Sequence, residues 1–369
     1  MMTVGDIERV VEQWAPAWTA WERDNVGLQI GERTRQVNKI LLALELTDGV
    51  VREAVKKKID LIVTHHPPLF RPLASLTDST QTGKNLLALA RQNIAVYSAH
   101  TNLDAARDGV SFALARTLGL LDVGFLAPLE NSLVKIVVFV PSSHVERLSA
   151  EMAEAGAGII GRYDSCSFRT RGTGTFRGGP QTNPWSGKRG VLETVDETRL
   201  EMIAPKARVD AILLSIRRVH PYEEVAYDVI PVSTPNSNYG MGALGHLGQP
   251  VSLSSFLRSA KRALHAERLR FVGDPRMNIK IVAVCGGSGS DLVDRAIRAG
   301  ADVFITADVR YHTFHAAAGR IALVDAGHWE TEHGVLESLQ RKLAEAVRRS
   351  KHKVSIVLAQ SLTNPIRSI

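Results

Sequence analysis

Residues 60–68 are Asp-Leu-Ile-Val-Thr-His-His-Pro-Pro, an apolar run that ends in two histidines and two prolines. The run has the length and character of a buried strand, and Pro67 and Pro68 cannot continue a central strand because proline lacks the pairing N–H. The sequence therefore predicts that His65 and His66 lie where the chain leaves the carboxyl edge of a sheet. Open α/β sheets build their binding sites at this edge. A solvated loop pair is the alternative interpretation.

The segments around this run alternate short apolar stretches with longer amphipathic ones, a pattern typical of repeated β-α units on a largely parallel sheet. In the first part of the chain we expect strands at 39–45, 60–64 and 95–99, and helices at 48–57, 84–91 and 110–118. The same alternation returns after Pro250, where we expect strands at 280–284, 303–306 and 321–325, and helices at 254–265, 292–299 and 330–349. The sequence predicts an α/β core domain with two lobes.

Between the two lobes the pattern changes. Here we expect strands at 134–140, 165–169, 173–177, 200–203 and 226–232, and helices at 144–155 and 209–217. If the Gly- and Pro-rich segment 177–190 is treated as an insertion, this is close to the β-α-β-β-α-β order of a ferredoxin-like α+β unit. The predicted organisation is therefore a first lobe at 1–130, an inserted domain at 131–233 and a second lobe at 234–369.

The composition limits the functional classes. The chain has 369 residues, of which 44% are hydrophobic and 22% charged, so it is neither disordered nor collagen-like. No apolar run is long enough for a membrane helix, and charged residues occupy the first segment, where a signal peptide would be apolar. We expect a cytoplasmic protein with no membrane partner. Only Cys166 and Cys285 are present, which excludes a disulfide framework and a thiolate zinc site and leaves the histidines as candidate metal ligands.

Two further strand ends carry metal-ligand residue types. The strand expected at 95–99 is followed by His100 and Asp104, and the strand at 321–325 is followed by His328 and Glu332. His328 and Glu332 are four residues apart, so one helical turn places them on the same face. Glu330 does not lie on the helix face that His328 and Glu332 share. Ordinary loop residues and helix capping are the alternatives at these two ends.

The ligand set selected from these strand ends has three imidazoles and two carboxylates and no thiolate. This is too many ligands for one open catalytic zinc ion, and it suits two divalent metal ions bridged by a carboxylate or water. Zinc, manganese, iron, cobalt and nickel all accept such mixed nitrogen and oxygen ligands. The predicted metal ligands are His65, His66, Asp104, His328 and Glu332.

Two further segments are candidates for lining the same site. Asp308 and His312 follow the strand expected at 303–306, where they are candidates for holding a ligand, moving a proton or contacting substrate. Capping of the next helix is the alternative. Gly287, Ser288 and Gly289 lie between an expected strand and a helix, where backbone N–H groups can bind a phosphate, although a plain tight turn fits equally.

The net charge of +7 is concentrated in two blocks. The first is expected in a loop and the second along a helix and the turn after it, and solvated faces or subunit contacts are the alternatives to nucleic-acid binding. The blocks are Arg162, Arg169, Arg171, Arg177, Lys188 and Arg189, and Arg341, Lys342, Arg348, Arg349, Lys351 and Lys353. His220, Glu223 and Glu224 suggest a further ligand site in the insert, for which local backbone structure is the competing explanation.

These motifs resemble those of the dinuclear-metal proteins called GTP cyclohydrolase I type 2 homologs, or NGG-one-interacting-factor-three-like proteins. The resemblance covers the whole chain and rests on segments 21–31, 64–68, 98–104, 285–289, 305–312 and 325–332. The insert is similar to PII and CutA-type modules, most clearly at 218–228. The family would have aspartate in place of Glu45 and glycine in place of Ala307.

The resemblance implies the same five metal ligands and a homohexameric ring with the insert capping it. Two such metals most naturally support hydrolysis, which predicts a metal-dependent hydrolase of a small phosphorylated, nucleotide-like or cyclic amide substrate. In that scheme His312, Asp308 or Glu330 moves the proton. The family label names GTP cyclohydrolase activity, but a label does not define a mechanism. The alternatives are a non-enzymatic metal-binding or regulatory ring and a ring that binds nucleic acid.

Overall fold

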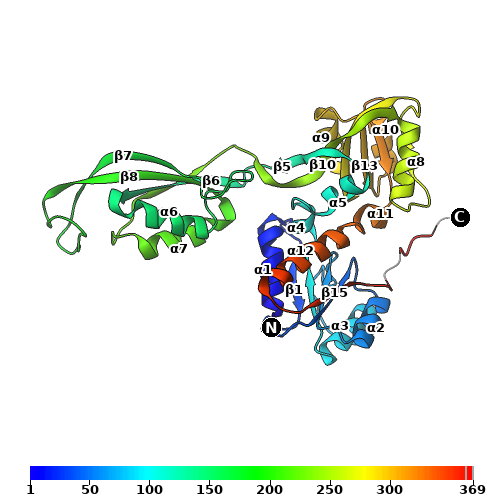
Figure 1. Cartoon of the computed structure of the whole chain (residues 1–369), viewed down its shortest axis with the longest axis horizontal. Helices are drawn as coiled ribbons and strands as arrows, with labels where there is room; N and C mark the ends of the chain where they lie inside the picture. Colours follow the sequence, from blue (N-terminus) through cyan, green and yellow to red (C-terminus); the bar gives the residue numbers. More distant parts are fainter. Residues whose placement is uncertain (362–363, 368–369) are drawn as a thin grey trace. The chain divides into compact units, whose positions relative to one another are not determined.

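The computed structural model describes residues 1–361 and 364–367. The chain divides into a core unit, Met1–Ala127 with Tyr239–Ile369, and an insert unit, Pro128–Asn238 (Figure 1). The sequence places the corresponding boundaries at 131 and 234. The predicted α/β class is confirmed, and several sheets carry it.

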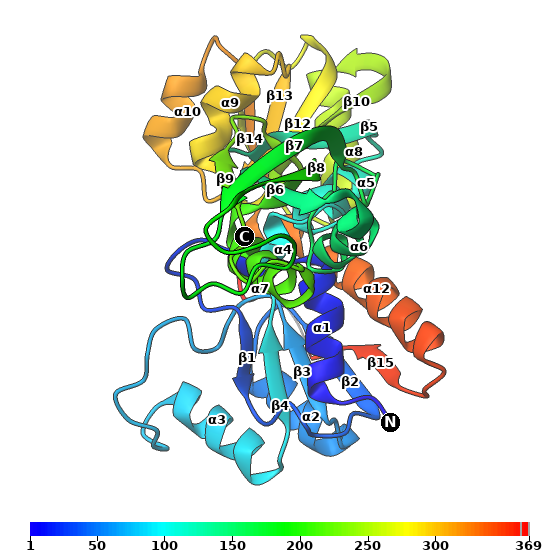
Figure 2. The same ribbon diagram turned by 90° about the vertical axis from the view of Figure 1, so that its left-hand side faces the viewer.

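The first sheet of the core unit has the strand order β1-β4-β3-β2-β15 (Figure 2). The strands β15, β2, β3 and β4 run parallel to one another, and β1 is antiparallel to β4. The three parallel strands expected from the sequence form the centre, and β1 and β15 add its two edges. The bounds are β1 (Gly27–Ile30), β2 (Lys39–Ala43), β3 (Leu61–Thr64), β4 (Ala95–Ser98) and β15 (Ser355–Leu358). Its accompanying helices are α1 (Val4–Trp14), η1 (Ala17–Thr19), α2 (Asp48–Lys57), α3 (Gln81–Arg91), α4 (Thr101–Asp104) and α5 (Val110–Thr117).

The central strands of this sheet are buried on both faces, because alternate residues enter two different cores. Ile40 and Leu42 pack on one side with the apolar stripe of a long C-terminal helix, while Leu41 packs on the other with α2 and α3. This double burial explains the continuous apolar runs that identify these strands in the sequence.

The second sheet has the order β11-β14-β13-β12-β10-β5, and β12, β13 and β14 are parallel. The strands are β5 (Leu121–Leu129), β10 (Asn236–Ser252), β11 (Arg270–Val272), β12 (Asn278–Ser288), β13 (Val303–Ala307) and β14 (Ala322–Asp325). The helices in this part of the chain are α8 (Leu253–Ala263), η4 (Ser290–Leu292), α9 (Val293–Arg298), α10 (Tyr311–Ala317), α11 (His328–Glu332) and α12 (Val335–Ser350).

The prediction of one helix over 330–349 is wrong, because α11 and α12 are separate helices. The Thr331 hydroxyl of α11 accepts a hydrogen bond from the N–H of Gly287 in β12, whereas Val335 and Leu339 of α12 enter the core beside the first sheet. His333 and Gly334 form the turn between the two helices, and each helix buries its own face. In the described part of the chain, no helix is both long and apolar enough to cross a membrane.

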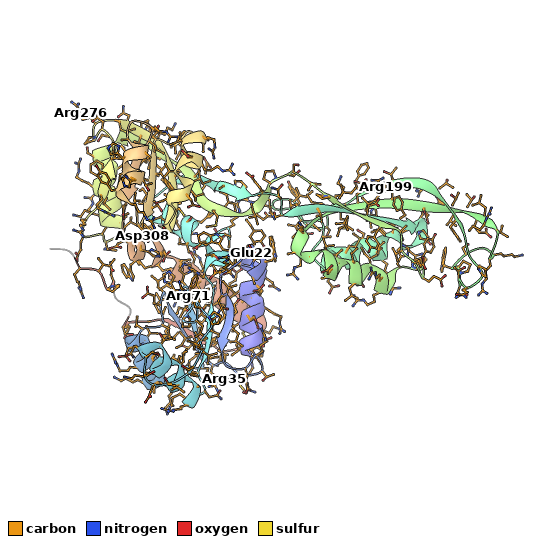
Figure 3. All side chains as sticks on the ribbon, turned by 180° about the vertical axis from the view of Figure 1, so that it is seen from behind. Glu22, Arg35, Arg71, Arg199, Arg276 and Asp308 are labelled. Carbon is orange, nitrogen blue, oxygen red and sulfur yellow. The ribbon has the colours of Figure 1, made fainter. Side chains whose placement is uncertain are left out.

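The insert unit has one antiparallel sheet in the order β7-β8-β6-β9. The apolar residues of one sheet face pack against α6 and α7, and Arg199 and Glu201 pair on the opposite face (Figure 3). The elements are β6 (Leu133–Pro141), η2 (Ser142–His144), α6 (Val145–Glu154), β7 (Phe168–Arg177), β8 (Leu192–Pro205), η3 (Lys206–Arg208), α7 (Val209–Val219) and β9 (Tyr227–Pro231). Assignment of this unit to the ferredoxin-like class stays a prediction.

Two expectations about the insert need correction. The segments expected at 165–169 and 173–177 form one strand, β7, and the segment expected at 200–203 is part of the much longer β8. Arg169, Arg171 and Arg177 of the first basic block therefore belong to a strand and not to a loop. Gly172 and Gly174 have low strand propensity and divide β7 in the sequence, and pairing along the length of β8 compensates for this local weakness.

Glu53 of α2 anchors the segment that follows β15. Its carboxylate accepts hydrogen bonds from the N–H groups of Gln360 and Ser361 and from the Ser361 hydroxyl, and it pairs with Lys57 at 2.6 Å. Burial opposes the charge, but these donors outweigh it and lower the pKa of Glu53 from 4.5 to about 2. A folded-state pKa below the unfolded value means that Glu53 stabilises the fold above pH 4.5 and loses this effect as the pH falls through about 2.

We predict that Glu53→Gln lowers the free energy of unfolding by about 1–3 kcal/mol at pH 7. The difference from the unmodified protein should shrink as the pH falls from 4.5 toward 2, measured by urea unfolding at each pH. Glu345→Gln is the control, since Glu345 forms only an exposed pair with Arg349. A difference independent of pH would contradict the proposed role of the charge.

Candidate metal centre

The site is built at the carboxyl ends of strands from both sheets of the core unit. Thr64 and Ser98 are register partners at the ends of β3 and β4, and their hydroxyls bond at 2.7 Å in the buried interior. This contact aligns the two strand ends, so that the histidines following β3 emerge beside the segment following β4. The third contribution comes from α11, which begins shortly after β14 ends. The structure thus brings together three segments that the sequence places far apart.

The five predicted ligands converge around the carboxylate of Glu332. Its Oε1 lies 3.0 Å from Nε2 of His328 and 3.8 Å from Nε2 of His65, and its Oε2 lies 3.2 Å from Nε2 of His66. Asp104 completes the set, with Oδ1 3.6 Å from Nε2 of His65. The side chains of His65 and Glu332 are 1% and 4% exposed, so the cluster is shielded from water on this side.

Each imidazole is oriented by an acceptor on its other ring nitrogen. Nδ1 of His65 donates to the carbonyl of Ala99 at 2.8 Å, and Nδ1 of His328 lies 2.6 Å from a carboxylate oxygen of Asp308. Nδ1 of His66 faces Glu45 at 3.5 Å. Contacts of this kind fix the ring and increase the basicity of the free Nε2, as they do around metal-binding histidines in general. All three Nε2 atoms consequently point into the cluster.

His100 also belongs to the cluster, although the predicted ligand set omits it. Its ring lies 5.3 Å from that of His65 and 5.4 Å from that of His66, measured between ring centroids. Nδ1 of His100 is held by Asp24 at 2.9 Å, which leaves Nε2 free. In the described residues, two trios have ligand atoms within 4.8 Å of one another: His65, His66 and His100, and His66, His328 and Glu332. The position of His100 directly after β4 was the signal that pointed to it.

Three buried ligand atoms in the cluster have no well-directed hydrogen bond: Nε2 of His65, Oδ1 of Asp104 and Oε2 of Glu332. A buried polar atom without a partner costs about 1–3 kcal/mol, so three in one place require an explanation. A divalent cation explains them, because it coordinates neutral imidazole nitrogen and carboxylate oxygen directly. The buried histidine and glutamate side chains are therefore suited to hold a metal ion.

The titration of the cluster reflects the crowding of its charges. Burial opposes protonation of His66, but Glu332 and Glu45 outweigh it and raise the pKa to about 10. The Glu332 carboxylate, assisted by Asp308, raises the pKa of His328 to about 9 against burial. Burial raises the pKa of Asp104 to about 6, and Glu332 adds to this effect while His65 opposes it. A metal that binds here displaces these imidazole protons.

Gly287 allows the end of β12 to approach the cluster closely. Gly287 and Ser288 belong to this strand, and only Gly289 lies in the connection to the next helix that the sequence predicts for all three. A Cβ atom at this position would lie 2.2 Å from Oε1 of Glu332 and 3.2 Å from Nε2 of His328, and the residue has φ of +62°. The N–H groups of Gly287 and Gly289 donate to the hydroxyls of Thr331 and Thr306. These two donors are already used, and an anion site at Gly287, Ser288 and Gly289 stays a prediction.

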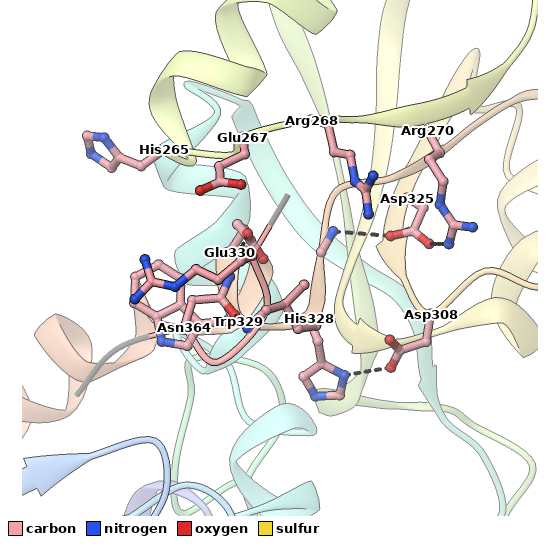
Figure 4. A pocket seen from close by; sticks show the side chains of 13 residues that line it. His265, Glu267, Arg268, Arg270, Asp308, Asp325, His328, Trp329, Glu330 and Asn364 are labelled. Carbon is pink, nitrogen blue, oxygen red and sulfur yellow. Dashed lines mark hydrogen bonds and ion pairs between the residues drawn. The ribbon is translucent and has the colours of Figure 1, made fainter. Parts of the chain in front are cut away.

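The predicted proton-transfer residues occupy different places. Asp308, held in the left-handed conformation with φ of 54°, contacts His328 and lines a cavity of about 780 Å³ beside it (Figure 4). Glu330 lines the same cavity and accepts a bond from Asn364 at 2.9 Å. His312 is exposed on α10, where its ring contacts Tyr311, and no contact with the cluster is found for it among the described residues.

Asp325 organises the wall between the cluster and this cavity. Its carboxylate accepts hydrogen bonds from the N–H groups of Val309 and Gly327 and pairs with Arg270. These contacts fix the loops that carry Asp308 and His328. The sequence offered Asp325 as the last residue of an expected strand, but it could not show that one carboxylate serves two loops.

The sequence of the chain matches a known protein family. A family model described as Duf34/NIF3 (NGG1p interacting factor 3) matches residues 2–365. The chain belongs to this family. A Bacillus subtilis relative of this NIF3-family chain is 38% identical over 361 residues, and one from Halalkalibacterium halodurans is 36% identical over 363 residues. The alignments cover 97% and 98% of this chain and 96% and 97% of the relatives, and both relatives are named GTP cyclohydrolase 1 type 2 homolog.

A solved structure supports the same membership. The crystal structure of a Bacillus cereus protein related to NIF3 matches this NIF3-family chain with a TM-score of 0.85 and 36% identity, over 100% of this chain and 99% of that one. The resemblance inferred from the sequence motifs is therefore confirmed. It extends through the insert, since the match covers the whole length.

We predict that His65→Ala and Glu332→Gln each abolish most metal binding, because both side chains are central to the cluster. Metal content is measured by elemental analysis after reconstitution with zinc or manganese and gel filtration. His312→Ala is the matched control and should bind as much metal as the unmodified protein. Equal metal content in all four proteins would show that the cluster does not hold the metal.

We predict that Gly287→Ala weakens metal binding by about tenfold or more, because the added methyl group displaces Glu332. Gly300→Ala is the matched control, since Gly300 also has a positive φ, +72°, but has open space where its Cβ would lie. Both variants carry backbone strain of about 1 kcal/mol, and only the first reaches a ligand. Competition titration with a chelating dye measures the affinity, and equal affinities for the two variants would contradict the close approach.

Proposed function

We propose that this chain is a metal-dependent hydrolase whose centre holds two divalent metal ions that share the carboxylate of Glu332. The observation that carries the proposal is the convergence of three buried atoms, from His65, Asp104 and Glu332, that make no well-directed hydrogen bond. His66 and His328 would hold one ion with Glu332. His65 and Asp104 would hold the other, together with Glu332.

A bound divalent ion polarises a carbonyl or phosphoryl oxygen and lowers the pKa of a water molecule. The mixed imidazole and carboxylate ligands suit zinc, manganese, iron, cobalt or nickel, and the chemistry of the donor set favours none of them strongly. The absence of thiolate ligands disfavours a purely structural zinc site, which typically uses cysteine. These considerations support a catalytic or sensing role for the centre.

Residues beside the cluster are suited to hold and move a proton. The Asp308 carboxylate is about half exposed, it faces the cavity and it already accepts from Nδ1 of His328. Glu330 has one oxygen bound to Asn364 and lines the same cavity. We propose Asp308 and Glu330 as the proton-transfer pair. His312 is the weaker candidate, because its described contacts lie away from the cluster.

The cavity indicates a small anionic or cyclic substrate. Its wall combines the indole of Trp329 with the cationic side chains of Arg268 and Arg367, and the carboxylates of Glu267, Asp308 and Glu330 line it as well. Guanidinium groups bind phosphate or carboxylate, and an indole face supports a planar ring. A phosphorylated, nucleotide-like or cyclic amide substrate therefore fits best. The names of the curated relatives include GTP cyclohydrolase, which is consistent with a nucleotide-like compound.

We also propose that the chain works as a homohexameric ring, as the family resemblance implies. The segment between β3 and α3 exposes Phe70, Leu73 and Leu76, which are 53%, 47% and 48% exposed. Contact with further copies would bury these apolar side chains. Binding of nucleic acid to the basic blocks is less well supported, because Arg169 already pairs with Glu146 and Arg349 with Glu345.

The proposed activity is tested with protein reconstituted with zinc, manganese or iron and incubated with p-nitrophenyl phosphate, GTP and a panel of cyclic amides. Product release is followed by absorbance and chromatography. We expect at least one substrate class to turn over about 100-fold faster than with metal-free protein, and Glu330→Gln to lower kcat while metal content stays unchanged. Full metal loading without turnover of any substrate would contradict the hydrolase and favour a non-enzymatic metal-binding or regulatory protein.

A further inference from the structure

The insert unit contains a cavity of its own, of about 380 Å³. It lies where the loop between β7 and β8 meets the segment that follows α7, and Figure 1 shows this loop at the end of the β7–β8 ribbon. The volume falls in the range of small-ligand cavities. The metal centre uses no residue of this cavity. Its main side chains are Phe176, Arg177, Trp185, Glu197, Tyr222 and Glu224.

Aromatic rings form one part of the wall. The centroid of Tyr222 lies 6.1 Å from that of Trp185 and 6.2 Å from that of Phe176, with interplanar angles of 50° and 54°. Rings tilted in this way expose parts of their faces to the same space instead of covering each other in a stack. Trp185 remains 48% exposed, so much of its surface is available to a ligand.

The surrounding chain holds the central ring of Tyr222 in place. His220 accepts a hydrogen bond from the N–H of Tyr222 at Nδ1, and its Nε2 contacts the carbonyl of Phe139 at 3.1 Å. His220 is therefore a structural residue that sets the turn, as the local-structure interpretation of the sequence predicts. The Tyr222 hydroxyl donates to Glu197 at 2.7 Å. The ring is thus fixed from both ends before any ligand arrives.

Carboxylates dominate the charge of this cavity. Glu197, Glu223 and Glu224 line it, against the single guanidinium of Arg177. Glu223 accepts from the N–H of Asn183 and so holds the β7–β8 loop against the cavity. Glu224 makes no hydrogen bond or ion pair within the described residues, so its charge is available. An anionic ligand would meet three like charges, whereas a cation would meet a favourable field.

We propose that this aromatic and acidic cavity binds a small organic ammonium ion, such as a quaternary or primary amine. The faces of Trp185 and Tyr222 attract a cation through their ring quadrupoles, and Glu224 supplies the balancing charge. An inorganic cation fits less well, since it prefers several oxygen ligands to aromatic faces. The insert would then make the chain responsive to an amine through a site that is separate from the metal centre.

The test compares choline with 3,3-dimethylbutan-1-ol, its neutral isostere, on the full chain by isothermal titration calorimetry. We expect choline to bind saturably and the neutral alcohol to bind at least about tenfold more weakly, because only the cation gains the ring and carboxylate interactions. Inorganic phosphate, used as the anionic probe, should not compete with choline.

Variants locate the binding to this cavity. Trp185→Leu keeps an apolar wall but removes the ring, and Glu224→Gln removes the free charge, so each should weaken choline binding by several-fold or more. Trp21→Leu is the matched control, since Trp21 is an exposed tryptophan of the core unit, 58% exposed, and should leave binding unchanged. Circular dichroism verifies that each variant is folded.

Four outcomes would overturn the proposal. They are the absence of saturable choline binding up to about 0.1 M, equal binding of choline and the neutral alcohol, displacement of choline by phosphate, and unchanged affinity in both Trp185→Leu and Glu224→Gln. The third outcome would indicate a site governed by Arg177. The fourth would place the choline elsewhere on the chain.

Discussion

The arrangement of the metal centre in the core unit depends on one interaction, the contact between the buried carboxylate of Glu332 and the imidazoles around it. The carboxylate lies within 4 Å of three imidazoles, two from the segment that follows β3 and one from α11. Gly287 leaves space for it because a Cβ atom at that position would collide with the carboxylate. Burial of such a carboxylate costs several kcal/mol unless positive charge or a metal compensates it. The fold supplies this compensation by bringing the carboxyl ends of strands in two sheets to one place. The protonated imidazoles compensate the charge of Glu332 in part, and the proposed metal centre would meet the same electrostatic requirement.

Much of this site could be predicted, because residue types that bind metals stand at or near the ends of strands that the sequence itself indicates. Proline after His65 and His66 marks the end of β3, and the four-residue spacing of His328 and Glu332 places both on one turn of α11. His100 was harder to assign, because a ligand beside a strand end resembles an ordinary loop residue until its partner Asp24 is known. Asp24 lies 76 residues earlier in the chain, and no local pattern connects the two.

The same distinction holds for the fold: elements defined by their local sequence pattern could be predicted, and elements defined by contacts with distant segments could not. Central strands such as β2 and β3 are continuous apolar runs and were predicted, whereas the edge strands β1, β11 and β15 are short and only partly buried. The break between α11 and α12 contains Gly334. The sequence does not predict it, because a single glycine is tolerated inside a helical pattern and only the separate packing of the two helices shows that the first one ends here. In the insert, the strand β7 is exposed and rich in glycine and threonine, and its partner β8 gives it structure.

The most direct test of the central claim is anomalous X-ray diffraction from crystals of the full chain grown with manganese or zinc, recorded at the absorption edge of the metal. The account predicts two anomalous peaks in the core unit, one on each side of the Glu332 carboxylate, with His66 and His328 around one peak and His65 and Asp104 around the other. A single peak would contradict the dinuclear assignment. Fully formed side chains around Glu332 with no peak at all would contradict the metal centre itself.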